Sequence, residues 1–132
     1  MRLGTALVIG LLLSRAAAAA PPPERSEEDF VLHCSGCHRL DGFGTPGVTP
    51  SLHGLGRLLV TREGRDYLAR VPGVAQAPLN DARLAALLNW VILAFSGSPP
   101  DPPYTAGEVG ALRRDPLRDP AAVRAGLGTG SR

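Results

Sequence analysis

The chain has 132 residues, about one domain's worth, and its 16 glycines and 13 prolines predict a small hydrophobic core. Its 14 basic residues are all arginine and stand against 12 acidic residues, for a formal net charge of +2. This near balance, without a basic stripe, argues against nucleic acid as a partner.

The N-terminus has the pattern of a cleaved secretory signal peptide, which we place at residues 1–19. Arg2 supplies the positive charge, Leu3 to Leu13 the apolar segment, and Ala16 to Ala20 the small residues suited to cleavage. The apolar segment is shorter than the roughly 20 residues that span a bilayer, so we expect no membrane span after cleavage. An uncleaved N-terminal anchor is the alternative. Cleavage also removes Arg15, which leaves 12 basic against 12 acidic residues, and export predicts a periplasmic protein.

The first expected helix runs from Ser26 to about Cys34. The Ser26 hydroxyl can accept hydrogen bonds from the free N–H groups at a helix start. The acidic residues from Glu27 to Asp29 suit the positive end of the helix dipole.

The pentapeptide from Cys34 to His38 has the spacing C-x-x-C-H and contains both cysteines of the chain. Two thiols at this spacing can each add to one vinyl group of a porphyrin, and the histidine that follows can bind the iron as the proximal ligand. The motif predicts one covalently bound haem c, attached to Cys34 and Cys37 and ligated by His38. The macrocycle would also provide apolar surface for a small core.

Two other interpretations of the cysteines are weaker. A thioredoxin-like redox pair needs βαβ neighbours, and the sequence around Cys34 predicts none. A zinc site needs four ligands around one ion, and His33, His38 and two cysteines within six residues cannot readily surround it tetrahedrally.

Loops and a second helix follow the pentapeptide. The segment from Asp41 to Ser51 holds three glycines and two prolines, which predicts an ordered loop. Thr61 is placed to cap a short helix that runs from Arg62 to about Val71. Pro72 to Pro78 is predicted to be another loop.

The strongest helix signal begins at Asn80 or Asp81 and ends near Phe95. Its apolar residues recur at the i, i+3, i+4, i+7 spacing of a helix with one buried face. These residues are Leu84, Leu87, Leu88, Val91 and Phe95.

The Pro-rich tail contains two more helix starts. Thr105 to Glu108 has the pattern of a capping box, and Asp119-Pro120 places proline at a first helical position. These signals predict short helices near 106–114 and 120–126. Because no segment alternates as a strand does, the sequence predicts an all-α fold with three main helices and one or two short helices in the tail.

This order of elements resembles a class I cytochrome c domain over roughly residues 26–96. Thr49 to Arg57 looks like the family's G-P-x-L-x-G-x-x-x-R stretch. Leu79 to Leu87 is similar to its L-S-D-A-E-L-A-A-L helix start, with Arg83 in place of the glutamate. Phe30 stands where the family has an aromatic residue that docks against the final helix.

The resemblance implies a division of the chain and a set of residues around the haem. Residues 20–97 would form the cytochrome c-like haem domain, and residues 98–132 a C-terminal extension. The Pro50 carbonyl would accept a hydrogen bond from His38, which orients the ring. The remaining expected haem neighbours are Leu52 against the ring, Arg57 and Trp90 at the propionates, and Tyr67 at the haem edge. The alternatives are a solvated surface position for Arg57 and a core position for Trp90.

The chain departs from the family at the sixth iron ligand. This ligand is usually a methionine in the loop before the last helix, but the corresponding loop from Arg70 to Pro78 has Val71 at that position. The only methionine of the chain is Met1, which is lost with the leader. His/Met ligation is therefore excluded for the mature protein.

Three alternatives for the sixth position stay open. His53 as the ligand would give bis-histidine iron with a lower potential than His/Met ligation. Gln76 or Asn80 would supply an oxygen or nitrogen ligand. The favoured alternative is a five-coordinate or water-bound iron, with Val71 or Val74 lining an apolar pocket.

The resemblance implies an electron carrier rather than an enzyme. It would shuttle single electrons in the periplasm and dock transiently on a redox partner such as a dehydrogenase or an oxidase. The alternative is a haem protein that uses an open sixth site for small-ligand binding, sensing or peroxide chemistry. The tail from Ser98 either docks on a dehydrogenase or covers the last helix of the haem domain.

Overall fold

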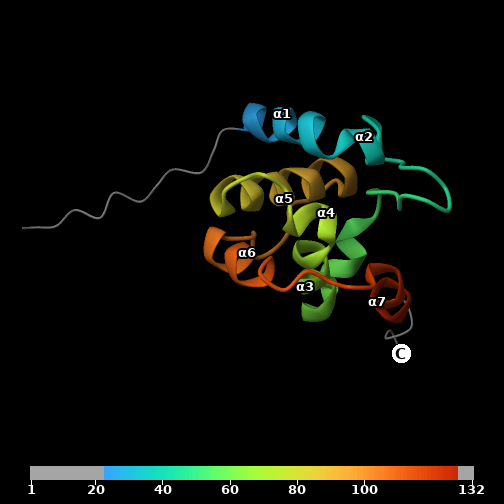
Figure 1. Ribbon diagram of the computed structural model, residues 1–132. Helices are drawn as coiled ribbons and strands as arrows, with labels where there is room; N and C mark the ends of the chain where they lie inside the picture. The colour runs from blue at the N-terminus through green and yellow to red at the C-terminus, as the bar shows by residue number, and fades with distance from the viewer. Residues whose placement is uncertain (1–22, 128–132) are drawn as a thin grey trace, which may run out of the picture.

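The computed structural model describes residues 23–127, and every regular element in this range is helical (Figure 1). The only β-type contact among these residues is an isolated bridge between Thr45 and Thr49. The predicted all-α class is therefore confirmed for the described part of the chain. The predicted signal peptide, residues 1–19, lies outside the described residues.

Helix α1 spans Pro23–His33 and begins earlier than predicted. Ser26 is inside the helix and only 3% exposed, so its predicted capping role is wrong. The reason is that proline is well suited to a first helical position, since its fixed φ already matches the helix, and Glu24 supplies an acidic residue in the first turn.

Helices α3 (Arg62–Arg70) and α5 (Asp81–Ser96) form as predicted. The Thr61 hydroxyl accepts from the backbone N–H of Gly64 at 3.1 Å, and the Asn80 side chain accepts from the N–H of Arg83 at 2.9 Å. Gly97 ends α5 in the left-handed conformation, with φ +77°.

Three short helical turns were not predicted as separate elements. They are α2 (Ser35–His38), the 3₁₀ turn η1 (Leu55–Val60) and α4 (Pro72–Ala75). Proline at the first position of α4 starts a helical turn where the sequence predicted a loop. Tertiary packing stabilises η1, because Leu55, Leu58 and Leu59 pack against the core.

The core lies around α5, which packs between α1 on one side and α6 on the other (Figure 1). Phe30 of α1 contacts the rings of Trp90 and Phe95 in α5, with centroids 5.6 and 5.2 Å apart. The expected docking of Phe30 on this helix is confirmed. Asp29 is 1% exposed and forms an ion pair with Arg83 of α5.

The tail forms helices α6 (Ala106–Leu112) and α7 (Pro120–Leu127), close to their predicted positions. Only half of the predicted capping box forms. The Thr105 hydroxyl accepts from the N–H of Glu108 at 3.2 Å, but the Glu108 carboxylate accepts from Arg65 of α3 instead of the N–H of Thr105. None of the helices within residues 23–127 has the length and apolar character needed to cross a membrane.

Candidate functional site

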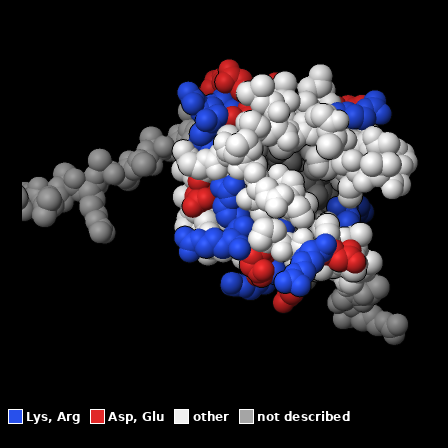
Figure 2. Space-filling view, in the orientation of Figure 1, with Lys and Arg blue, Asp and Glu red and all other residues white. Residues whose placement is uncertain are grey.

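A cavity in the described part of the chain has a volume of about 680 Å³ and is walled mainly by apolar side chains. Figure 2 shows a hollow bordered by uncharged residues. This volume falls in the usual range for small-molecule and cofactor sites. The walls come from the α1–α2 junction, the loop after it, η1, α3, α4, α5 and α7. The polar lining residues are Cys34, His38, Ser51, Tyr67 and Arg124.

The C-x-x-C-H segment continues α1 and reaches the cavity wall. The N–H of Cys34 donates to the Phe30 carbonyl at 2.9 Å, and the N–H of His38 donates to the Cys34 carbonyl at 3.0 Å. Cys34 is half-buried and lines the cavity, whereas Cys37 is exposed and is not part of the lining. Burial, assisted by the charge of Asp29, raises the pKa of the Cys34 thiol to about 11. Both cysteines are unpaired thiols.

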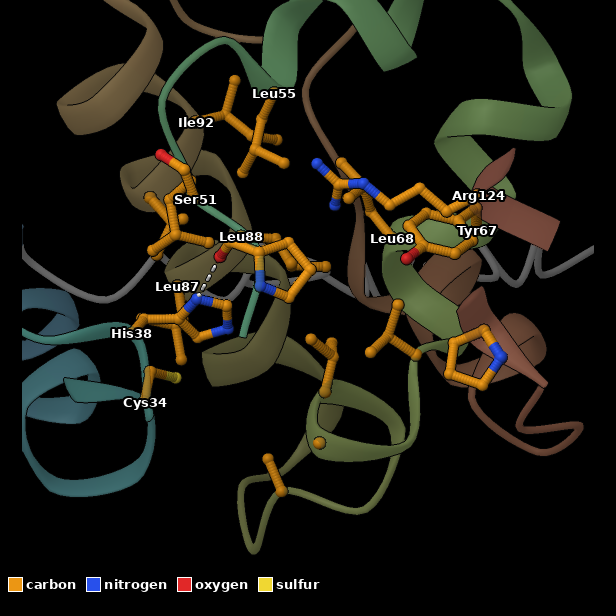
Figure 3. Close-up of a pocket in the computed structure, with 18 of the residues that line it drawn as sticks. Cys34, His38, Ser51, Leu55, Tyr67, Leu68, Leu87, Leu88, Ile92 and Arg124 are labelled. Atoms are coloured by element: carbon orange, nitrogen blue, oxygen red, sulfur yellow. Dashed lines mark hydrogen bonds between the residues drawn. The ribbon is translucent and has the colours of Figure 1, made fainter. Parts of the chain in front are cut away.

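The His38 ring projects into the cavity and is oriented by one hydrogen bond (Figure 3). Its Nδ1 lies 3.1 Å from the Pro50 carbonyl oxygen. Because a carbonyl only accepts, Nδ1 carries the proton, and Nε2 keeps a free lone pair. Burial lowers the pKa of His38, the charge of Arg124 acts in the same direction, and the Pro50 carbonyl opposes both. A neutral imidazole with a free Nε2 is the form that binds metal ions.

The loop after His38 is folded so that the Pro50 carbonyl meets this ring. The N–H of Gly44 donates to the His38 carbonyl at 3.0 Å, and the N–H of Leu52 donates to the Gly42 carbonyl at 2.8 Å. Gly42 has φ +73°, and a Cβ there would lie 2.4 Å from the Phe95 ring. Only glycine fits this turn, which therefore sets the position of Pro50 and Leu52.

Besides Cys37, the expected site residues His53, Arg57 and Trp90 also lie outside the cavity lining. The His53 Nε2 is 2.8 Å from the Asp41 carbonyl oxygen, and its ring stacks on Phe43 with centroids 4.3 Å apart. Trp90 packs between α1 and α5 against Phe30. The Arg57 guanidinium lies next to the backbone of Gly54 and is not part of the lining. The structure brings Cys34, His38, Pro50, Leu52 and Tyr67 together in the cavity.

The cavity wall formed by α3 and α4 is aliphatic apart from Tyr67. Val71, Val74 and Ala77 line it, together with Leu68 and Gly73. Gln76 is exposed, and the Asn80 side chain caps α5, so neither residue lines the cavity. Among the lining residues, His38 supplies the only imidazole, and none supplies a thioether.

An arginine from the tail holds the segment that follows this wall. Arg113 donates to the carbonyl oxygens of Ala75, Ala77 and Leu79 at 2.6–2.9 Å, and it pairs with Asp81 at 3.1 Å. These contacts add hydrogen bonds from a charged donor to carbonyls at the end of α4 and in the irregular segment after it. Sequence reasoning missed this role, because the bonded residues are 32–38 positions apart and no local pattern connects them.

Helix α7 covers one side of the cavity, which the sequence did not predict. Pro120, Ala121, Arg124 and Ala125 all contribute to the lining. The Asp119-Pro120 signal predicted the helix, but nothing in the sequence indicates where it docks. Arg124 is half-buried, and Figure 3 shows its side chain extending into the cavity.

Comparison of the chain with protein-family models, with curated proteins and with solved structures finds no match. Within residues 23–127 no three His, Cys, Asp or Glu side chains gather as a metal-binding cluster.

Proposed function

We propose that this chain is a mono-haem c-type cytochrome that carries single electrons, with a haem domain like those of class I cytochromes c. The observation that carries the proposal is the arrangement of His38. Its Nδ1 is bonded to the Pro50 carbonyl, and its ring projects into an apolar cavity of about 680 Å³ that Cys34 also lines. This is the arrangement that a covalently attached haem with a histidine ligand requires.

The residues present fit this cofactor. Cys34 and Cys37 would hold it through thioethers, each formed when an S–H adds across a vinyl group, so that sulfur bonds to one carbon and hydrogen to the other. Leu52, Leu68 and Leu88 are buried around the cavity and would pack against the macrocycle. The haem would supply one-electron chemistry at iron, and the chain would position it and limit its exposure.

The exposed side of the site suits transient docking of a redox partner. Cys37 is exposed, and Leu40, Phe43 and Val48 of the segment that follows it are 71%, 60% and 80% exposed. Brief electron-transfer encounters use small interfaces, for which such a surface around a haem edge is sufficient. With the predicted export signal, the partner would be a periplasmic dehydrogenase or oxidase.

Covalent haem content tests the proposal. The full chain, expressed with its leader in a host that attaches haem c, is expected to keep haem after denaturation and to show one haem per chain in a pyridine haemochrome assay. A reversible one-electron titration should then give a single midpoint potential. A purified protein without covalent haem would overturn the proposal.

A second candidate function follows from the α3–α4 wall, where only Val71, Val74 and Ala77 would face the sixth position together with Tyr67. Such a wall favours an open site that binds small ligands or reacts with peroxide. Absorption spectra of the ferrous protein with and without carbon monoxide separate the two functions. A spectrum that carbon monoxide shifts supports the open site, and one indifferent to it supports electron transfer with an internal ligand.

A further inference from the structure

The cavity contains two polar groups that the proposed haem attachment does not use. The Tyr67 side chain is 5% exposed, and its hydroxyl points into the cavity (Figure 3). The Arg124 guanidinium extends into the same space from α7. Within residues 23–127 neither the hydroxyl nor the guanidinium has a hydrogen-bond or ion-pair partner.

An unpaired arginine among apolar side chains loses hydration free energy. Arg124 is the only charged arginine or lysine among the lining residues, and no acidic residue lines the cavity. A half-buried cation among apolar side chains requires an anion to offset its lost hydration. Guanidinium groups bind carboxylates especially well, through two parallel hydrogen bonds.

The position of Arg124 relative to the cysteines indicates which anion it would bind. Haem carries its two carboxylate side chains on the edge opposite its two vinyl groups. Cys34, which would hold a vinyl-derived carbon, lies on the α1–α2 side, and Arg124 lies across the cavity from it (Figure 3). The carboxylates would therefore point toward the Arg124 and Tyr67 side.

We propose that Arg124, assisted by the Tyr67 hydroxyl, binds a haem carboxylate and thereby fastens α7 over the cavity. The tail would then complete the cofactor site instead of only covering the core, and Arg57 would not take this role. This inference rests on the proposed haem function and adds a cofactor-binding residue from outside the haem domain.

The test compares variants of the full-length holoprotein. Arg124→Gln removes the positive charge, Arg124→Lys keeps it, and Arg118→Gln removes an exposed charge of the same tail as a matched control. Leu127→Ala removes an apolar anchor of α7 and leaves the guanidinium in place. The measurements are covalent haem content, midpoint potential, and amide hydrogen exchange of residues 120–127.

The expected result is a lower midpoint potential in Arg124→Gln, because loss of a cation beside the haem favours the ferric state. Exchange of the α7 amides should also rise by about fivefold, the factor that 1 kcal/mol of lost interaction produces. Arg124→Lys should retain most of the potential, and Arg118→Gln all of it. Leu127→Ala should speed exchange without lowering the potential, which separates loss of the charge from loosening of the helix.

Two results would overturn the inference while leaving the proposed function intact. One is full haem content with an unchanged potential in Arg124→Gln, together with a lowered potential in Arg57→Gln. The other is an unchanged potential combined with weaker binding of azide or cyanide, which would make Arg124 a partner of anions bound at the iron. Absence of covalent haem from the wild-type chain would overturn both proposals. If Arg124→Gln does not fold, equal α7 exchange in wild-type apoprotein and holoprotein would still contradict the inference.

Discussion

The two sides of the cavity are built in different ways. The histidine side depends on short-range contacts: residues 34–52 are joined by backbone hydrogen bonds to neighbours, and His38 meets Pro50 only 12 positions away. The side formed by α3, α4 and α7 is held by arginine contacts between distant segments. Arg65 and Arg70 of α3 donate to Glu108 and Asp115 of the tail, and Arg113 of the tail donates to the Ala77 carbonyl. Local geometry thus fixes the histidine side, whereas the opposite side depends on the tail.

The largest effect is expected on the histidine side. Replacing both Cys34 and Cys37 by serine should abolish covalent haem attachment, because a hydroxyl forms no thioether with a vinyl group. A haem stain of the denatured protein measures this loss. His33→Ala is the control, since His33 is exposed and one residue from the motif. Covalent haem that persisted in the double variant would show that attachment does not use these thiols.

The next largest effect is expected at the contact between α3 and η1. A Cβ at Gly64 in α3 would lie 1.8 Å from the Leu58 carbonyl oxygen of η1. Gly64→Ala must therefore separate η1 from α3, at a cost of about 3 kcal/mol in the free energy of unfolding. Urea unfolding measures this cost. Gly107→Ala, where a Cβ meets no atom within 4 Å, should leave stability unchanged or slightly higher.

Arg113 provides the direct test of long-range support. Arg113→Met should lower the free energy of unfolding by about 2 kcal/mol, because the carbonyls of Ala75, Ala77 and Leu79 lose their hydrogen bonds from the guanidinium. Hydrogen exchange in this segment should accelerate, while exchange near His38 stays unchanged. The matched control is Arg114→Met, an exposed neighbour expected to change stability by less than about 0.5 kcal/mol. Equal effects of the two substitutions would contradict the assigned role.

The ion pair between Arg65 of α3 and Glu108 of α6 makes the tail contact pH-dependent. The hydrogen bond from Arg65 lowers the pKa of Glu108 below its ordinary value of 4.5, and burial only partly opposes it. The pair therefore stabilises the fold fully above that ordinary value, and its contribution is lost as the pH falls through the lowered one.

Glu108→Gln should cost about 1 kcal/mol near neutral pH, a modest value because the carboxylate is partly exposed. The difference from wild type should shrink as the solution is acidified, which urea unfolding at a series of pH values can follow. Glu63→Gln, at an exposed carboxylate of α3, is the control. If the difference in the free energy of unfolding between Glu108→Gln and wild type stays constant in acid, it does not come from the ion pair with Arg65.

The smallest effect is expected at His53. Its ring stacks on Phe43 and contacts the Asp41 carbonyl, so His53→Ala should cost about 1 kcal/mol or less of stability. The ferrous absorption spectrum should not change, because His53 does not line the cavity. A change from a low-spin to a high-spin spectrum would instead identify His53 as the sixth ligand.

Much of the fold could be predicted because its signals are local. Thr61 caps the helix that it was expected to cap, α5 begins at Asp81, one of its two expected starts, and Gly97 ends it. The errors arose where tertiary contacts outweigh local preference. Ser26 is buried inside α1 instead of capping it, and the Glu108 side chain turns to Arg65 instead of completing its capping box.

The candidate site divides in the same way. Cys34, His38 and Pro50 could be predicted because a short motif and one matching segment contain them, and the structure places all three at the cavity. The positions of Arg57 and Trp90 could not be predicted from the sequence, since residues from other elements decide whether a side chain faces a cavity. No local sequence pattern indicated that Arg124 would line the cavity.

The sequence by itself determined the longer helices and the C-x-x-C-H segment. Each of these depends on residue identity or on spacings of a few positions. Only the tertiary structure decided that the tail reaches back to the cavity, with Arg113 holding the segment after α4 and Arg124 entering the pocket. These contacts join residues more than 30 positions apart, and the burial that drives them is non-directional, so no local pattern records them.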